Sequence, residues 1–155
     1  MSQDTVNTLN LIIQGTIGLT MVTTFLIYFF QLKTMRKGTL GQNSISLINY
    51  LQDEKTREAR RIVMTLKDKD YSLWTVDELY AASMVCSNYE VLSILIYQMS
   101  LVPSDIFIEN WGPSIKICYE ILKEHIEEMQ KPENSGPRYW DNFEKLYKEV
   151  VKNGY

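Results

Sequence analysis

The sequence predicts an all-α protein, with one N-terminal transmembrane helix followed by a small cytosolic bundle of four main helices plus a short one. Two observations lead to this fold class. No charged residue occurs between Asp4 and Lys33, so residues 5–32 form a long uncharged run. After that run, apolar residues recur at steps of three and four, which is the period of a helix, and no segment alternates as a strand does.

The uncharged run has the length and composition of a membrane-spanning helix. Leu11–Phe30 consists mostly of large apolar residues and threonines. At a rise of about 1.5 Å per residue, residues 5–32 are long enough to cross a hydrocarbon core of roughly 30 Å. A cleaved signal peptide is the alternative, but it needs a basic start and a small-residue cleavage site, and the sequence has neither. We therefore expect residues 1–37 to form a short tail and a single transmembrane helix with a basic flank.

The basic flank predicts an orientation. Lys33, Arg36 and Lys37 follow the run directly, and no Lys or Arg precedes it. Because basic flanks stay in the cytoplasm, the N-terminus should lie outside and the C-terminal domain in the cytoplasm. We expect the bacterial inner (plasma) membrane as the location and the lipid bilayer as a partner.

Polar and small residues inside the run raise the question of helix packing. At about 100° per residue, Thr16 and Thr20 share one side of the helix, and Gln14 and Gly18 lie together on another. Such residues can pack and hydrogen-bond against a second membrane helix. The alternative is that each threonine bonds a carbonyl of its own helix and that the glycines are only tolerated.

The rest of the chain divides into a linker and a helical domain. Residues 38–43 should be a linker that is flexible at its two glycines, and residues 44–155 a cytosolic helical domain. Thr75 and Glu78 have the spacing of a capping box. Gly112-Pro113 should end a short helix and open the next. The expected helices are residues 44–66, about 76–100, 103–110 (the short one), about 113–129 and about 138–152.

A second uncharged run, Val91–Ser104, is too short to span a bilayer. It fits a buried core helix better, and a second membrane pass remains the alternative. Cys86 and Cys118 fit a reducing compartment, as small buried hydrophobes rather than as a disulfide.

Charge is distributed unevenly in the helical domain. The helix that starts the domain holds Arg57, Arg60 and Arg61, whereas residues 71–115 hold no Lys or Arg. Glu90 adjoins an apolar stretch, so a structural ion pair between it and Arg60 or Arg61 is expected to join two helices. A sharper hypothesis is that Arg57, Arg60 and Arg61 bind a phosphate-bearing ligand or partner.

His125 is the only histidine, which limits both metal and catalytic chemistry. A zinc site needs several Cys or His ligands at a recognisable spacing, and Cys86 and Cys118 are far apart along the chain. A nucleophilic enzyme needs Ser or Cys beside a base, and the sequence has neither a nucleophile elbow nor a phosphate-binding glycine loop. We therefore expect no metal, no cofactor and no enzymatic activity.

Several short motifs follow one another in an order that resembles a known family. They are Ala59-Arg60-Arg61-Ile62-Val63, Trp74, Val85-Cys86, Tyr89-Glu90-Val91-Leu92, Leu101-Val102-Pro103, Trp111-Gly112-Pro113-Ser114-Ile115, Ile121-Leu122, Ile126, Tyr139-Trp140 and Phe143-Glu144-Lys145-Leu146. Together they resemble a bacterial domain-of-unknown-function family of short, membrane-anchored, all-helical proteins, over residues of about 55–148. The resemblance implies a helical fold and no assigned reaction.

The leading functional hypothesis is a non-enzymatic, single-pass membrane protein that presents a cytosolic helical interaction module. It would act through self-association or a cytosolic protein partner. The alternative is a ligand-gated membrane effector, for example in bacterial antiphage defence, whose cytosolic domain senses a phosphate-rich nucleotide signal. A small membrane-bound hydrolase is a third hypothesis, and the residues for it are missing. The formal net charge of −3 disfavours a nucleic-acid polymer as partner.

Overall fold

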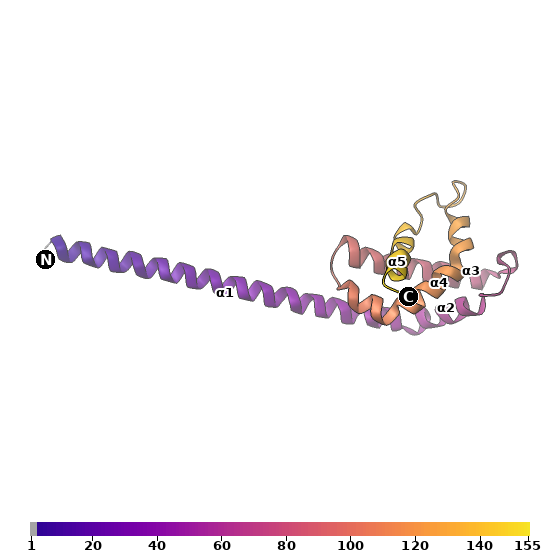
Figure 1. The fold of residues 1–155 in the computed structure, drawn as a ribbon, viewed down its shortest axis with the longest axis horizontal. Helices are drawn as coiled ribbons and strands as arrows, with labels where there is room; N and C mark the ends of the chain where they lie inside the picture. Colours follow the sequence, from indigo (N-terminus) through magenta and orange to yellow (C-terminus); the bar gives the residue numbers. More distant parts are fainter. Residues whose placement is uncertain (1–2) are drawn as a thin grey trace. The chain divides into compact units, whose positions relative to one another are not determined.

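The computed structural model describes residues 3–155, with side chains described at positions 7, 8 and 12–155. All the regular elements in this part of the chain are helices, which confirms the predicted fold class (Figure 1). They are α1 (Gln3–Gln52), α2 (Glu54–Thr65), the 3₁₀ turn η1 (Tyr71–Leu73), α3 (Val76–Ser93), the π-helical turn η2 (Ile94–Gln98), α4 (Ser104–Met129) and α5 (Asp141–Lys152).

The chain divides into two compact units, residues 1–39 and residues 40–155. The boundary falls inside residues 38–43, which the sequence predicted as a flexible linker. The prediction of a linker is wrong about local structure, because residues 38–43 are all helical and belong to α1. A glycine inside a helix costs only about 1 kcal/mol relative to alanine, and a helix already formed on both sides can carry that cost.

The first helix predicted for the second unit, residues 44–66, is interrupted at Asp53. Helix α1 ends at Gln52, and the Asp53 carboxylate accepts a hydrogen bond from the Lys55 backbone N–H at 3.1 Å. Asp53 is therefore the N-cap of α2. An aspartate side chain competes for backbone N–H groups, so it favours a helix start over a helix interior.

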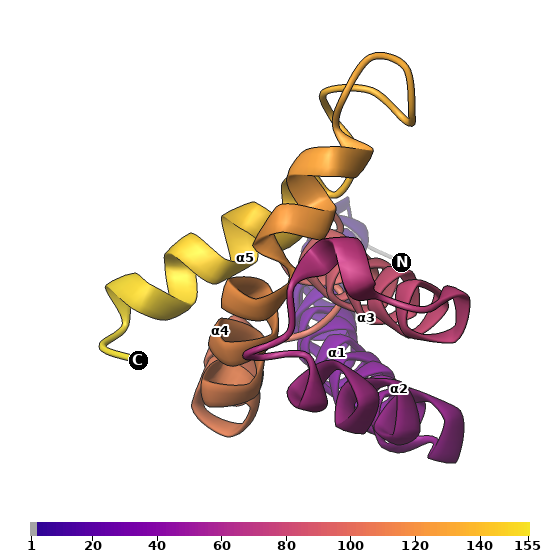
Figure 2. The same cartoon turned by 90° about the vertical axis from the view of Figure 1, so that its right-hand side faces the viewer.

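Helix α3 is the central helix of the second unit. It packs against α2, α4 and α5, and α4 in turn packs against α2 and α5 (Figure 2). The predicted capping box opens α3: Glu78 Oε2 accepts from the Thr75 N–H at 2.7 Å, and Thr75 Oγ1 accepts from the Glu78 N–H at 3.3 Å. In the core, the rings of Tyr89 and Phe143 stack with 5.1 Å between their centroids.

The second uncharged run does supply core residues. Leu92, Ile96 and Val102 from this run are buried. The helix does not persist through Ser104, however: α3 passes into η2, and residues 99–103 lie outside the helices.

Helix α4 is continuous where the sequence predicted two helices. Gly112 and Pro113 both lie inside it. Proline lacks the N–H that would bond the carbonyl of residue 109, and this defect usually breaks a helix. Here the Tyr155 hydroxyl donates to the Glu109 carbonyl at 3.3 Å. The Tyr155 ring packs so closely on Gly112 that a Cβ there would lie 2.9 Å from it.

The last helix begins at Asp141 rather than at 138. Trp140 precedes it with φ 61°, in the left-handed region that bulky residues rarely adopt. The Trp140 side chain is buried, and its Nε1–H donates to Ser87 Oγ at 3.3 Å. Burial and this hydrogen bond hold the unfavourable backbone conformation in place.

Candidate functional site

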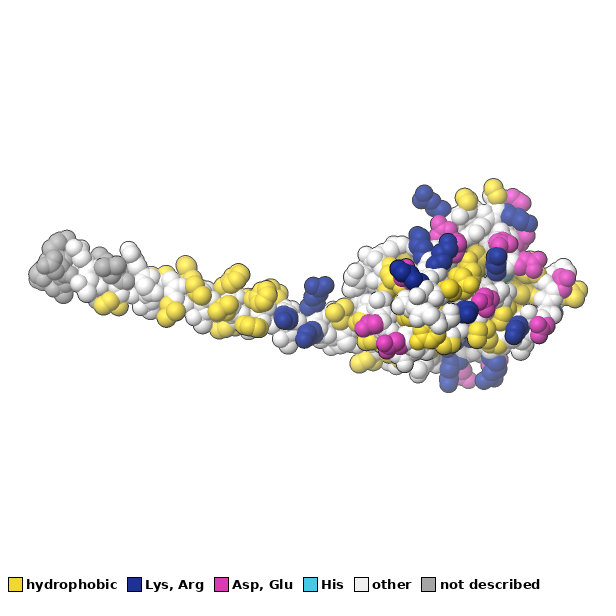
Figure 3. Space-filling view, viewed as in Figure 1, with side chains coloured by type: hydrophobic (Ala, Val, Ile, Leu, Met, Phe, Trp, Pro, Cys, Tyr) yellow, Lys and Arg dark blue, Asp and Glu magenta, His cyan; other side chains and the backbone are white. Residues whose placement is uncertain are grey.

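The first unit presents a bare apolar surface. From Ile12 to Leu32 the large hydrophobic side chains are exposed, Phe25 at 70%. Figure 3 shows them in yellow, followed by dark blue basic side chains. The helical stretch Ile12–Gln52 is long and apolar enough to cross a membrane, and none of its most apolar window is buried. Val76–Gln98 passes the same length and composition test, but half of its window is buried in the second unit, as in a soluble core helix.

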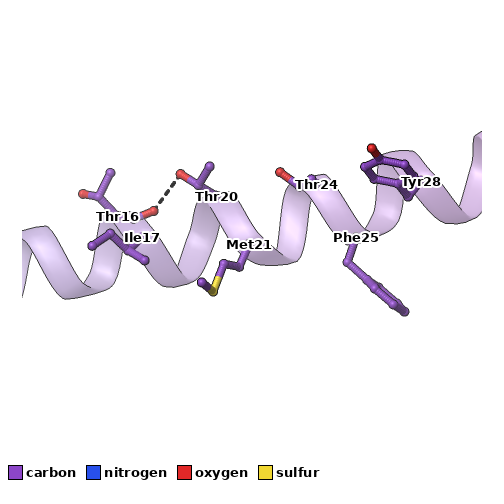
Figure 4. Close-up of a pocket in the computed structure, with 7 residues that line it drawn as sticks. All are labelled: Thr16, Ile17, Thr20, Met21, Thr24, Phe25 and Tyr28. Carbon is purple, nitrogen blue, oxygen red and sulfur yellow. Dashed lines mark hydrogen bonds between the residues drawn. The ribbon is translucent and has the colours of Figure 1, made fainter.

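One face of this surface carries two parallel rows of side chains (Figure 4). The rows together line a shallow pocket formed by Thr16, Ile17, Thr20, Met21, Thr24, Phe25 and Tyr28. The hydroxyl groups of Thr16 and Thr20 donate to the carbonyls of Ile12 and Thr16, each at 2.8 Å. These bonds are the intrahelical alternative stated above, so the threonines need no second helix to satisfy their hydroxyl protons. Gln14 is exposed, and a Cβ at Gly18 would meet nothing within 4 Å.

The expected ion pair between Glu90 and the arginines does not form among the described residues. The Glu90 carboxylate instead accepts hydrogen bonds from Asn142 Nδ2 at 2.6 Å and from the Phe143 backbone N–H at 2.8 Å. Glu90 thus caps the start of α5 from the neighbouring helix α3. Backbone N–H groups at a helix N-terminus favour a negative charge, so they compete successfully with a distant guanidinium.

The three arginines of α2 differ in their surroundings. Arg61 Nη1 pairs with Glu58 at 3.1 Å, and the Arg61 side chain is 77% exposed. Arg57 is also exposed. Arg60 is half-buried, and its guanidinium carbon lies 4.9 Å from the centroid of the Trp111 ring on α4. The structure therefore does not present the three as one uniform cluster.

Trp111 also lines a pocket between the end of α1 and α4. The pocket has a volume of about 480 Å³. Its lining combines apolar and polar side chains: Ile48, Gln52, Ile106, Asn110, Trp111 and Ser114. No local sequence pattern predicts this pocket, because its two walls are more than fifty positions apart in the chain.

His125 lies inside the bundle, at the centre of a small hydrogen-bonded cluster. Its side chain is only 2% exposed, with Nδ1 3.1 Å from the Tyr71 hydroxyl and Nε2 3.0 Å from Ser83 Oγ. The rings of Trp74 and Trp140 lie at centroid distances of 6.1 and 5.4 Å. Burial lowers the pKa of His125, so the imidazole is neutral at pH 7. Both ring nitrogens already have hydroxyl partners. We therefore interpret His125 as a residue that stabilises the bundle rather than as a catalytic base.

The two thiols are buried and free of a disulfide. Burial raises the pKa of Cys118 to about 11 and that of Cys86 well above its usual value. Both are therefore protonated at neutral pH, and a protonated thiol is a poor nucleophile. Across the described residues, no group of three or more His, Cys, Asp and Glu side chains is placed to hold a metal ion.

A family model described as "Domain of unknown function (DUF4760)" matches residues 19–150. The chain belongs to this family. The match confirms the resemblance to a domain-of-unknown-function family. It begins within the apolar stretch of α1 and extends into α5, so it includes the Trp111 pocket, Glu90 and His125. No curated protein and no solved structure matches the chain.

Proposed function

We propose that this member of the DUF4760 family is a single-pass membrane protein whose residues 40–155 form a helical interaction module in the bacterial cytoplasm. The exposed apolar side chains of α1, from Ile12 to Leu32, carry the proposal. So much contiguous apolar surface is unfavourable in water, and a bilayer removes it from water without any protein partner.

The proposed orientation rests on the charges beside that surface. Lys33, Arg36 and Lys37 are all exposed and follow it within α1. Near anionic lipid headgroups each contributes roughly 1 kcal/mol of attraction, and the positive-inside rule places them in the cytoplasm.

The module is proposed to work by binding rather than by catalysis. The sole histidine is enclosed, and both thiols are buried and protonated, so the groups that most often serve as base or nucleophile are already used in packing. Self-association or a cytosolic protein is the proposed partner. Membrane attachment would raise the local concentration of such a module.

A topology experiment on the full chain tests the proposal. Green fluorescent protein or alkaline phosphatase is fused after Tyr155 in a bacterial host. We expect the fluorescent fusion to be active and the phosphatase fusion to be inactive, with both proteins in the membrane fraction. As a control, Lys33, Arg36 and Lys37 are replaced by glutamine and three lysines are placed ahead of the span, which should shift the orientation. Strong phosphatase activity in the unaltered chain, or recovery of that chain in the soluble fraction, would contradict the proposal.

A second candidate function is a membrane effector gated by a phosphate-rich nucleotide signal. One observation favours it: the half-buried Arg60 contacts Trp111, which lines a pocket, and has no carboxylate partner among the described residues.

A further inference from the structure

The Arg60 guanidinium lacks the partners that half-buried arginines usually have. In the described part of the chain it has no hydrogen-bond acceptor and no carboxylate within ion-pair distance; its contact is the face of Trp111, at 4.9 Å. A guanidinium has five N–H donors, and burying them without acceptors is unfavourable. Arg61, the next residue, shows the ordinary arrangement, an exposed pair with Glu58.

Tyr89 and Cys118, two core groups whose pKa values are affected by Arg60, do not compensate its charge. Its positive charge acts to lower the pKa of Tyr89 and Cys118, but burial is the larger effect and raises both. The phenol and the thiol are therefore neutral at pH 7. The Tyr89 hydroxyl is already hydrogen-bonded to Ser114 Oγ at 2.9 Å. Among the described residues, the partly exposed Arg60 therefore has no anionic partner.

The pocket lined by Trp111 has the size and lining of a small-molecule site. Its volume of about 480 Å³ lies in the range of about 300–1,000 Å³ usual for ligand pockets. Ile48 and Ile106 supply apolar walls, and Gln52 supplies an exposed amide. Asn110 Nδ2 donates one hydrogen bond to the Ile106 carbonyl at 2.7 Å. Arg60 is not among the lining residues, and it adjoins the pocket through its contact with Trp111.

We propose that this pocket binds a small molecule that carries a phosphate group on an organic body. Arg60 holds the phosphate, and Trp111, Ile48 and Ile106 hold the body. An arginine on an aromatic face keeps N–H donors for an anion, and its fork matches phosphate oxygens. Arg57, one turn earlier on α2, adds positive charge, which favours a dianionic phosphate over a single carboxylate. The inference deepens the second candidate function and does not depend on the membrane topology.

Two sources of this chemistry are distinguishable: a soluble nucleotide and a phospholipid headgroup. The full chain is placed in nanodiscs of neutral phosphatidylcholine, and Tm is measured with added adenosine monophosphate, inorganic phosphate or adenosine. A separate sample uses nanodiscs that contain phosphatidic acid and no soluble ligand. We expect adenosine monophosphate to raise Tm in a concentration-dependent manner and adenosine to have no effect.

Matched variants assign the effect to the site. Arg60→Gln should weaken the affinity for adenosine monophosphate about tenfold or more, since a charge-assisted contact is lost. Arg61→Gln, which removes the same charge from the neighbouring position, should change it less than about threefold. Ile106→Trp fills the pocket from its exposed edge and should abolish binding while Arg60 is retained, which covers the case in which Arg60→Gln does not fold.

The outcomes separate cleanly. A response confined to phosphatidic acid nanodiscs and lost in Arg60→Gln supports the phosphate site and makes a lipid headgroup its source. No stabilisation by any of the phosphate compounds in the unaltered chain overturns the proposal. So do equal losses in Arg60→Gln and Arg61→Gln, which would show non-specific charge attraction, and binding that survives Ile106→Trp. None of these results alters the membrane topology, so the two proposals fail independently.

Discussion

Glu90 on α3 caps helix α5: its Oε2 accepts a hydrogen bond from the backbone N–H of Phe143 at 2.8 Å. The residues of α5 offer no such cap themselves, since Trp140 at the N-cap position provides no side-chain acceptor. The carboxylate thus satisfies a helix N-terminus and joins two helices that both bury side chains in the core.

Replacing Glu90 should therefore destabilise the second unit. Glu90→Ala removes a charge-assisted hydrogen bond and a helix cap, so we expect a loss of about 2 kcal/mol in the free energy of unfolding. Glu90→Gln should lose less, because one amide oxygen can still accept. Thermal or urea unfolding of the full chain in detergent, followed by circular dichroism at 222 nm, measures both.

Two comparisons make this prediction specific. Glu120→Gln removes a charge from an exposed position of α4 and should change stability by less than about 0.5 kcal/mol. A double-mutant cycle of Glu90→Ala with Arg60→Gln should give a coupling energy under about 0.5 kcal/mol, because the two side chains do not pair. A coupling energy above about 1 kcal/mol would restore the ion pair expected from the sequence.

The contact between Tyr155 and the Glu109 carbonyl leads to a second prediction. Tyr155→Phe removes the donor that replaces the missing N–H of Pro113, and should cost about 1 kcal/mol. Pro113→Ala supplies a helical N–H for the same carbonyl. In the Pro113→Ala background, Tyr155→Phe should therefore cost close to nothing.

The four proteins of this cycle are compared by thermal unfolding. Pro113→Ala alone should raise Tm, since an interior proline costs up to about 3 kcal/mol in a helix. If Tyr155→Phe costs the same in both backgrounds, the hydroxyl does not compensate for the proline.

A third prediction concerns the dependence of stability on pH. Burial lowers the pKa of His125 below its ordinary value of 6.5 in the folded state. Between the two pKa values the unfolded chain binds more protons than the folded chain, so stability falls with decreasing pH. The contribution is fully present above about pH 6.5 and is lost as the pH falls below it.

Tm measured between pH 5 and pH 8 checks this dependence. Asp70, Glu78 and Glu128 also have pKa values lowered by hydrogen bonds, but they start from 3.8 or 4.5, so their effects begin at lower pH. His125→Gln should flatten the profile above pH 5, whatever its effect on stability at pH 8. A slope that persists in this variant would assign the titration to another group.

The features that the sequence predicted correctly are local ones. The apolar run, the helical periodicity and the Thr75–Glu78 capping box are each written in consecutive residues. Gly112-Pro113 led to the wrong prediction of a helix break because this signal is equally local. The hydroxyl that compensates for the missing N–H of Pro113 comes from the distant Tyr155.

The site residues that were missed depend on contacts between distant positions. The partners of His125 are 54 and 42 positions away, at Tyr71 and Ser83. The partners of Glu90 are about fifty positions away, on α5. Opposite charges on two helices indicated that an ion pair could form. Charge alone does not identify the partner, however, when a helix N-terminus competes for the same carboxylate.

The last prediction concerns the threonines of α1. Because Thr16 and Thr20 donate to carbonyls of their own helix, replacing both by leucine removes no hydrogen bond to a second helix. We expect Thr16→Leu with Thr20→Leu to leave self-association of the full chain unchanged in a bacterial membrane two-hybrid assay. The exchange also raises the hydrophobicity of the span, so poorer insertion cannot explain a loss of signal. A clear loss would show that these side chains contact a second membrane helix. An unchanged signal that exceeds a poly-leucine control assigns self-association to residues other than this threonine pair.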